Sequence, residues 1–241
     1  MKYYLLKESI DLEIAGNFPQ STDAKHNCHV WDEPAFIEHH ELTPIDFEPI
    51  VSNAILHNKA KLTDIISTSG MGFTRKLLVS GKLKNIIRDN VNNSNVQFFK
   101  SPILYKGQII DDYWIIYCNK SFSEFIDLSK SIIKIRKRKP EGGTYLENIS
   151  FENYYSFEFY MIENKLEGKL FFSNICLFDN IDNEFFALKY VEGGIQYFVS
   201  EKLKQKIDEA GCTGIEFQPS ELSYNEWVAP GGEREKIYGK I

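Results

Sequence analysis

One short sequence occurs twice in the chain: LLVSGKLKNII at 77–87 and YFVSEKLKQKI at 197–207. The serines of the two copies, Ser80 and Ser200, stand 120 positions apart. After each serine, apolar residues recur at spacings of three and four, which predicts a helix with one apolar face. Each serine also stands where an N-cap residue accepts an amide hydrogen bond from the first turn. The repeat therefore predicts two helices of one design.

Each predicted helix is followed by a short strand that carries an aromatic residue. The strands read VQFFKSPI at 96–103 and GIEFQPSEL at 214–222, so that Phe98 corresponds to Phe217 after a shift of one residue. Gly211 follows the second helix at a position where glycine readily adopts a left-handed conformation. We therefore expect two related strand–Ser–helix–strand units, near 77–103 and 197–222.

The rest of the pattern predicts a sheet-rich α+β (mixed α/β) protein. Aromatic residues make up 14% of the chain, and such side chains suit half-buried sheet surfaces. We expect the chain to divide into an N-terminal α/β part at 1–104, with the first unit, and a C-terminal α+β part at 105–241, with the second. The other expected elements are strands at 2–6 and 111–120, a helix or turn followed by a strand at 121–135, two strands around a turn at 156–178, and a helix at 47–60.

Bulk composition restricts the location and the partners of the chain. The formal net charge of −6 argues against general affinity for nucleic acid or anionic membranes, which select basic surfaces. The four cysteines are widely spaced and form no CxxC pair, which favours reduced thiols in the cytoplasm. The N-terminus lacks the pattern of a signal peptide, and no uncharged apolar run approaches the roughly 18 residues of a membrane span. We expect a soluble cytoplasmic protein.

The segment HNCHVWDEPAFIEHH at 26–40 is the densest group of possible metal ligands. Imidazole, thiolate and carboxylate groups bind transition metals when three or four converge on one point. Their spacing matches no common zinc signature, so a histidine-rich surface loop is the competing interpretation. The candidate ligands are His26, Cys28, His29, His39 and His40.

The same segment also supports an enzyme as an alternative function. A cysteine nucleophile needs a base beside it, and Cys28 has histidines nearby in sequence, although no local signature accompanies it. The other cysteines, Cys118, Cys176 and Cys212, lie in apolar or turn contexts and are expected to pack in the interior. The alternative is thus a metal-dependent or cysteine-based enzyme that uses the cluster from His26 to His40.

Two further stretches invite a function that binds phosphate or nucleic acid. The loop STSGMGFTRK at 67–76 lacks the GxxxxGK[ST] pattern of a phosphate-binding loop, because Gly70 and Gly72 stand too close together. The basic run at 134–139 could contact phosphates, and it supports a nucleic-acid-binding module as a second alternative. Its alternation with apolar residues instead predicts an amphipathic strand, with Lys134 and Arg136 pointing outward.

The sequence FVSEKLKQKIDEAGCTGIEFQP at 198–219 resembles the C-terminal hallmark of family 11 of the bacterial polymorphic-toxin immunity proteins. Upstream, GQIIDDYWIIYCNKSFSEFIDLSKS at 107–131 is similar to the tyrosine-bearing strand of that family and its Asp-x-x-x-Ser element, here Asp127 and Ser131. The resemblance covers mainly residues 105–222. In the first unit, an Asn-rich stretch replaces the glycine turn of the second.

The resemblance implies a protein used in competition between bacteria, one that binds a cognate toxin and neutralises it by stoichiometric occlusion. The family implies no catalytic residues and no cofactor. An acidic chain would suit a basic toxin. Exposed aromatic residues beside acidic ones are the expected anchors, with burial of the tryptophans in the core as the alternative. These candidates are Trp31 with Asp32 and Glu33, and Tyr224 and Trp227 with Glu221 and Glu226.

Overall fold

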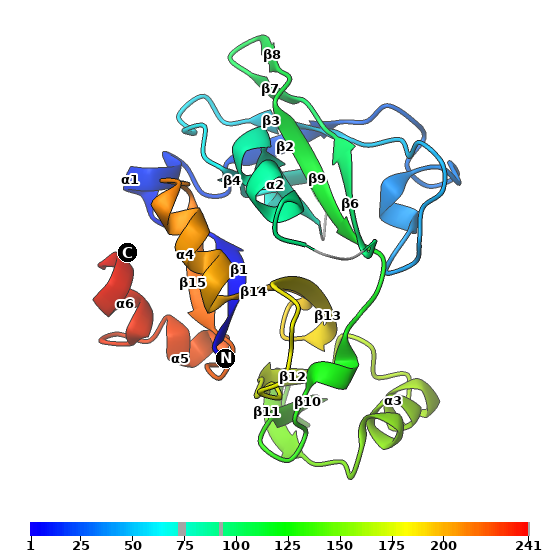
Figure 1. The fold of residues 1–241 in the computed structure, drawn as a ribbon. Helices are drawn as coiled ribbons and strands as arrows, with labels where there is room; N and C mark the ends of the chain where they lie inside the picture. Colours follow the sequence, from blue (N-terminus) through cyan, green and yellow to red (C-terminus); the bar gives the residue numbers. More distant parts are fainter. Residues whose placement is uncertain (72–75, 92–93, 241) are drawn as a thin grey trace.

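The computed structural model describes residues 1–71, 76–91 and 94–240, and their fold is mixed α+β (Figure 1). A seven-stranded sheet has the order β11-β10-β12-β13-β14-β1-β15, and two four-stranded sheets have the orders β4-β5-β9-β6 and β2-β3-β7-β8. No helix in the described ranges is long and apolar enough to cross a membrane. The expected loop at 67–76 contains a 3-10 helix, η2 (Ser69–Met71), and its residues 72–75 lie outside the described part.

Both predicted repeat units are present, and each is part of a matching four-stranded arrangement. The first unit consists of β4 (Ile65–Ile66), β5 (Leu77–Ser80), α2 (Gly81–Arg88), β6 (Val96–Lys100) and β9 (Tyr113–Cys118). The second unit consists of β13 (Phe185–Val191), β14 (Gly194–Ser200), α4 (Glu201–Glu209), β15 (Ile215–Pro219) and β1 (Tyr3–Glu8). The strand orders β4-β5-β9-β6 and β13-β14-β1-β15 correspond position by position.

Strand register shows how closely the two units agree. Val79 lies opposite Ile65, and Val199 lies opposite Phe185, so both pairs keep the offset of 120 positions. On the other side of the hairpin, Val79 pairs with Trp114 of β9. Val199 likewise pairs with Tyr4 of β1. The predicted correspondence of Phe98 with Phe217 is confirmed, because Phe98 lies opposite Ile116 of β9 and Phe217 lies opposite Leu6 of β1.

The fourth strand of the two units comes from different places in the chain. In the first unit, β9 follows β6, and it pairs with both β5 and β6. In the second unit, the equivalent strand is β1 at the other end of the chain, and it pairs with β14 and β15. The N-terminal strand is thus a central strand of the C-terminal unit, so that the first residues of the chain complete a sheet formed by the last (Figure 1).

The two units have separate but equivalent polar networks at the starts of their helices. Ser80 accepts a hydrogen bond from the amide of Leu83 and donates one to Asp64 over 2.5 Å. Ser200 accepts from the amide of Leu203 and donates to Glu184. A lysine two residues after each serine completes the network: Lys82 pairs with Asp64 at 3.2 Å, and Lys202 pairs with Glu184 at 2.9 Å. Both predicted N-caps are therefore confirmed, and each is anchored to a carboxylate.

The network around Ser200 makes the stability of the fold depend on pH in the acidic range. Burial raises the pKa of Glu184, but the hydrogen bonds from Lys202 and Ser200 outweigh it and lower the pKa below its usual value. A carboxylate with a depressed pKa stabilises the fold above the pKa that it has when unfolded, and this contribution is lost as pH falls through the folded value. We expect Glu184→Gln to be less stable than wild type at pH 7 and to lose less stability below pH 4.5. Urea unfolding at several pH values tests this, with Glu48→Gln at an exposed carboxylate as the control; parallel pH profiles for wild type and Glu184→Gln would contradict it.

Residues 9–64 form an insertion between β1 and β4. It contains α1 (Leu12–Ala15), β2 (Ser21–Lys25), η1 (Ile37–His39) and β3 (Asn53–Leu56), and its sheet is completed by β7 (Ile103–Tyr105) and β8 (Gln108–Ile110). The expected helix at 47–60 is wrong. Ala54 and Leu56 are buried on one face of β3, which lies between β2 and β7. Buried residues thus alternate along this segment with a period of two, which is the period of a strand and not of a helix.

Residues 119–184 form the equivalent insertion between β9 and β13. It contains η3 (Ser123–Phe125), β10 (Ile132–Arg138), β11 (Thr144–Ile149), α3 (Tyr154–Glu163) and β12 (Leu170–Asn174). The expected strand at 121–135 is confirmed as β10, but the first of the two strands expected at 156–178 is wrong. That segment is helix α3, which begins at a capping box in which Asn153 and Ser156 bond each other's backbone amides.

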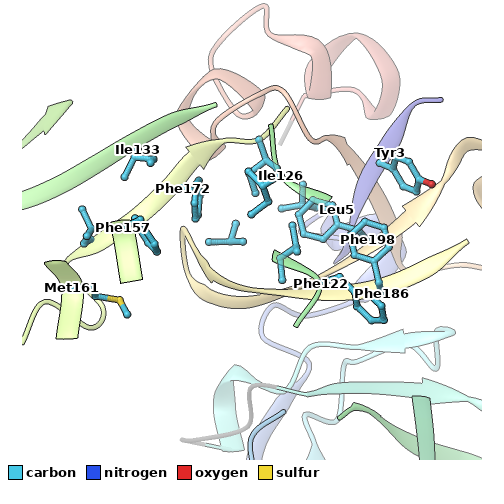
Figure 2. Close-up of a cluster of buried hydrophobic side chains, with 14 of the residues drawn as sticks. Tyr3, Leu5, Phe122, Ile126, Ile133, Phe157, Met161, Phe172, Phe186 and Phe198 are labelled. Carbon is cyan, nitrogen blue, oxygen red and sulfur yellow. The ribbon is translucent and has the colours of Figure 1, made fainter. Parts of the chain in front are cut away.

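Three buried clusters hold these parts together. The central one joins both repeat units, with Leu83 and Ile87 of α2 beside Leu203 and Ile207 of α4, and the two helices lie side by side (Figure 1). A second cluster lies under the first insertion. The third cluster joins β1 and the second unit to the second insertion; Figure 2 shows Leu5 near Phe198 and Phe186. The insertions therefore flank a duplicated centre.

Candidate functional site

A groove runs over the centre of the molecule, between the segment that follows β2 and the second insertion. It consists of two adjoining pockets, of about 400 and about 690 Å³, which share Glu41 and Ile195. The first is lined by Val30, Trp31, Phe36, Glu38, His39, His40, Glu41, Leu42, Lys76, Tyr117, Cys118, Ile195 and Tyr197. The second is lined by Glu41, Arg136, Glu167, Gly168, Leu170, Phe171, Lys189, Tyr190, Val191, Glu192, Gly193, Gly194 and Ile195.

The wall of the first pocket contains a buried ion pair. Lys76 lies 3.0 Å from Glu38, and their side chains are only 8% and 10% exposed. The ammonium group also lies 5.7 Å from the ring centre of Tyr117, whose hydroxyl donates to the carbonyl of Thr43 over 2.7 Å. These contacts hold the segment with Glu38 and Thr43 against β9, so this side of the groove is formed by a fixed wall.

The second pocket is crossed by a lysine with two acidic partners. Lys189 of β13 lies 3.1 Å from Glu41 and 3.5 Å from Glu167. Burial lowers the pKa of Lys189, but the two carboxylates outweigh it, so the pKa is raised overall and the ammonium stays charged. Lys189 therefore connects the end of the histidine-rich segment to the turn that follows α3.

The histidines of the 26–40 segment point to different partners. His26 bonds Ser52 at 2.8 Å, His29 pairs with Asp32 at 2.9 Å, and Nε2 of His40 lies 2.8 Å from the carbonyl of Pro34. His39 packs its ring against Phe36, with the ring centres 5.5 Å apart. Within residues 1–71, 76–91 and 94–240, no three His, Cys, Asp or Glu side chains are gathered as metal ligands. The sequence cluster is spread over the surface of the segment.

The cysteines are poorly suited to act as nucleophiles, because a nucleophilic cysteine reacts as its thiolate. Cys118 lies in the groove wall and is buried, and burial raises the pKa of its thiol far above the usual range. Burial, together with Glu33, also raises the pKa of Cys28. Both thiols are therefore protonated near neutral pH, and the prediction that Cys118 packs in the interior is confirmed.

Of the predicted anchors, Trp31 is the one at the groove. Its side chain is 80% exposed at the rim of the first pocket. Asp32 pairs with His29, and Glu33 accepts a hydrogen bond from the amide of Ala35 over 3.0 Å. The structure thus places Trp31, Asp32 and Glu33 on an exposed turn beside the first pocket, which aromatic side chains such as Tyr117 and Tyr197 also line.

The C-terminal candidates lie elsewhere, and one of them is in the interior. Trp227 ends α5 (Tyr224–Trp227) and is 1% exposed; it packs edge-on against Tyr238 of α6 (Glu233–Tyr238). For Trp227 the core interpretation is correct. Glu226 belongs to the capping box of the same helix, in which Ser223 is the N-cap residue. Hydrogen bonds from Ser223 and Asn174 to the carboxylate of Glu226 lower its pKa. Glu221 and Tyr224 remain at the surface, away from the groove.

The predicted outward direction of the basic run is confirmed. Ile133 and Ile135 of β10 are buried, whereas Arg136 is exposed and its guanidinium lies 5.5 Å from the ring centre of Phe171. Lys137 pairs with Glu147 of β11 at 2.9 Å. The positive charges of the run are therefore divided between two faces of a sheet and partly neutralised.

No protein-family model matches the chain, and no curated protein matches it by sequence.

A second exposed surface was missed by the sequence interpretation. On α3, Tyr155, Phe159 and Ile162 point to solvent at positions i, i+4 and i+7, while Phe157 and Met161 point into the core (Figure 2). The signal was present in the sequence, because Asn153 and Ser156 form a recognisable helix start. Reading the segment as two strands hid this outward face.

Proposed function

We propose that the chain is an immunity-type protein that binds a cognate bacterial toxin and neutralises it by stoichiometric occlusion, without catalysing a reaction. The resemblance of residues 105–222 to an immunity-protein family suggests this function. The observation that carries it is the exposure of Trp31 at the rim of the groove, next to two carboxylates. An exposed tryptophan beside a preformed pocket is typical of an anchor in a protein interface.

The charge of the protein supports a basic partner. The net charge is −6. Asp32 and Glu33 follow Trp31 in the sequence, and Glu41 lines the first pocket. Complementary charge speeds the encounter of two proteins and disfavours partners of the wrong sign. An inhibitor must capture its toxin before the toxin reaches its target, so rapid capture is a physical requirement of this function.

The test uses the toxin encoded beside the gene for this chain. We expect a one-to-one complex on gel filtration and survival of cells that express both proteins. Undiminished killing, with no complex formed, would refute the function.

The location of the anchor is tested separately. We expect Trp31→Ala to raise the Kd for the toxin about 30-fold, which corresponds to about 2 kcal/mol for a central aromatic anchor. Calorimetry or surface plasmon resonance measures this. Phe178→Ala removes an exposed aromatic ring that lines neither pocket and serves as the matched control. Equal affinity of both variants would place the anchor elsewhere.

A further inference from the structure

Helix α3 is apolar on its outer face as well as on its inner face. Phe157 and Met161 are buried against the core, and the ring of Phe157 lies tilted against that of Phe172, with the ring centres 4.8 Å apart. On the outer face, Tyr155, Phe159 and Ile162 are 84%, 68% and 63% exposed. A helix at a protein surface normally presents polar residues to water, and a helix that is apolar all round is normally covered. The outer face of α3 therefore has the composition of a buried surface.

The apolar surface continues beyond the helix. Tyr160 is partly exposed and lies 5.5 Å from Phe151, ring centre to ring centre. Tyr145 of β11 is also partly exposed, and it lies opposite Lys137 of β10. In the described part of the chain β11 is the outer strand of its sheet, with β10 as its one hydrogen-bonded neighbour. Exposed apolar residues gathered on one element mark sites of protein contact.

The charges on α3 itself are negative, and basic residues lie at its margin: Lys165 follows the helix, and Lys137 is paired with Glu147. Between positions 150 and 164 the chain holds Glu152, Glu158 and Glu163 and no lysine or arginine. Within the ranges that the structure describes, none of these three carboxylates forms an ion pair with the rest of the chain. An occupant that covers the apolar residues must therefore accept three carboxylates at the margin, and a basic surface does so.

The position of α3 connects it to the groove. The helix ends at Glu163, and the turn that follows contributes Glu167 and Gly168 to the second pocket. Stable complexes bury about 800 Å² on each partner, so an interface normally needs more than one exposed side chain as its anchor. The outer face of α3 therefore belongs to the element that leads directly into the second pocket.

We propose that the outer face of α3, formed by Tyr155, Phe159 and Ile162, is the second contact surface for the cognate toxin. This inference rests on the proposed function. Its occupant is a protein surface that presents apolar side chains surrounded by lysine and arginine. A second copy of this chain fits poorly, because a two-fold interface would bring the Glu158 and Glu163 carboxylates of both copies to the margin of one contact.

The experiment compares two triple variants of the full-length chain with the toxin encoded beside its gene as the probe. Tyr155→Ser/Phe159→Ser/Ile162→Ser removes the outer face of α3. Leu62→Ser/Ile109→Ser/Ile237→Ser removes three exposed apolar side chains from other elements and is the matched control. We expect the first variant to raise the Kd at least about 100-fold and the control to stay within about threefold of wild type. All substituted side chains are exposed, and circular dichroism verifies that both variants fold.

Charge is tested with Glu158→Lys/Glu163→Lys. We expect association with the toxin to slow at least about tenfold at low salt, and the difference to shrink as salt is added. If wild type binds and the α3 variant binds equally well, the inference is refuted and the proposed function stands. If wild type does not bind, both are refuted. A dimer of wild type in sedimentation that the α3 variant loses would instead assign this face to a second copy.

Discussion

Arg234→Met is expected to lower the free energy of unfolding by about 3–5 kcal/mol, because it removes one partner of a buried ion pair. Arg234 of α6 donates two hydrogen bonds to Glu216 of β15, over 2.8 and 2.6 Å, and the two side chains are 2% and 3% exposed. Glu216 also accepts hydrogen bonds from the hydroxyl of Ser9 and the amide of Ile10. The pair thus fastens the C-terminal helix to the end of β1 and to β15. Urea unfolding followed by circular dichroism measures the loss.

The double variant Arg234→Met/Glu216→Leu separates the cost of an unpaired charge from the value of the pair. Buried ion pairs contribute little net stability, since desolvation offsets their attraction, whereas an unpaired buried charge is costly. We expect the double variant to recover at least half of the stability that Arg234→Met loses. A double variant that is less stable than the single one would show that the pair itself stabilises the fold. Lys236→Met removes one partner of an exposed ion pair with Glu233; it is the control and should change stability by less than about 0.5 kcal/mol.

Local features of the chain were predictable, because local physics decides them. The two helices follow from apolar residues at spacings of three and four behind a capping serine, and Ser80 and Ser200 do cap them. Asp64 and Glu184, whose carboxylates accept hydrogen bonds from those serines, lie 16 positions upstream of them. Spacing alone gives no means of choosing these two among 34 acidic residues.

Segments with continuous apolar character could not be assigned from their pattern. FEFYMI in α3 fits a helix and a strand equally well, and its capping box is the feature that separates them. The sequence also does not show which of the candidate anchors are exposed to solvent. Trp31 and Trp227 both stand beside acidic residues in sequence, and only packing against Tyr238 places Trp227 in the interior.

A local sequence pattern also cannot predict that β1 pairs with strands of the C-terminal unit. Residues 2–6 read clearly as a strand, but the partners of β1 are β14 and β15, almost the whole chain away. A strand pattern specifies which face is buried and leaves the neighbouring strands unspecified. The repeat predicted two units, whereas tertiary packing decided that the first strand of the chain belongs to the second unit.

Leu6→Ala and Ile116→Ala form a matched pair that tests this arrangement. Leu6 of β1 lies opposite Phe217, and Ile116 of β9 lies opposite Phe98, so the two residues occupy equivalent positions in the two units. Both are buried in the central cluster, at 2% and 0% exposure. Each substitution is expected to cost about 2–5 kcal/mol, as for other buried leucine or isoleucine residues replaced by alanine.

Hydrogen exchange distinguishes where each variant opens. Because β1 is a central strand of the second unit, Leu6→Ala should lower protection first in β14 and β15, nearly two hundred positions away in sequence. Ile116→Ala should lower it first in β5 and β6 of the first unit. Leu12→Ala, at an exposed position of α1, is the control. If Leu6→Ala instead lowered protection only in the adjoining insertion at 9–64, β1 would not be the strand that closes the C-terminal unit, and the correspondence between the two units would lose its fourth member.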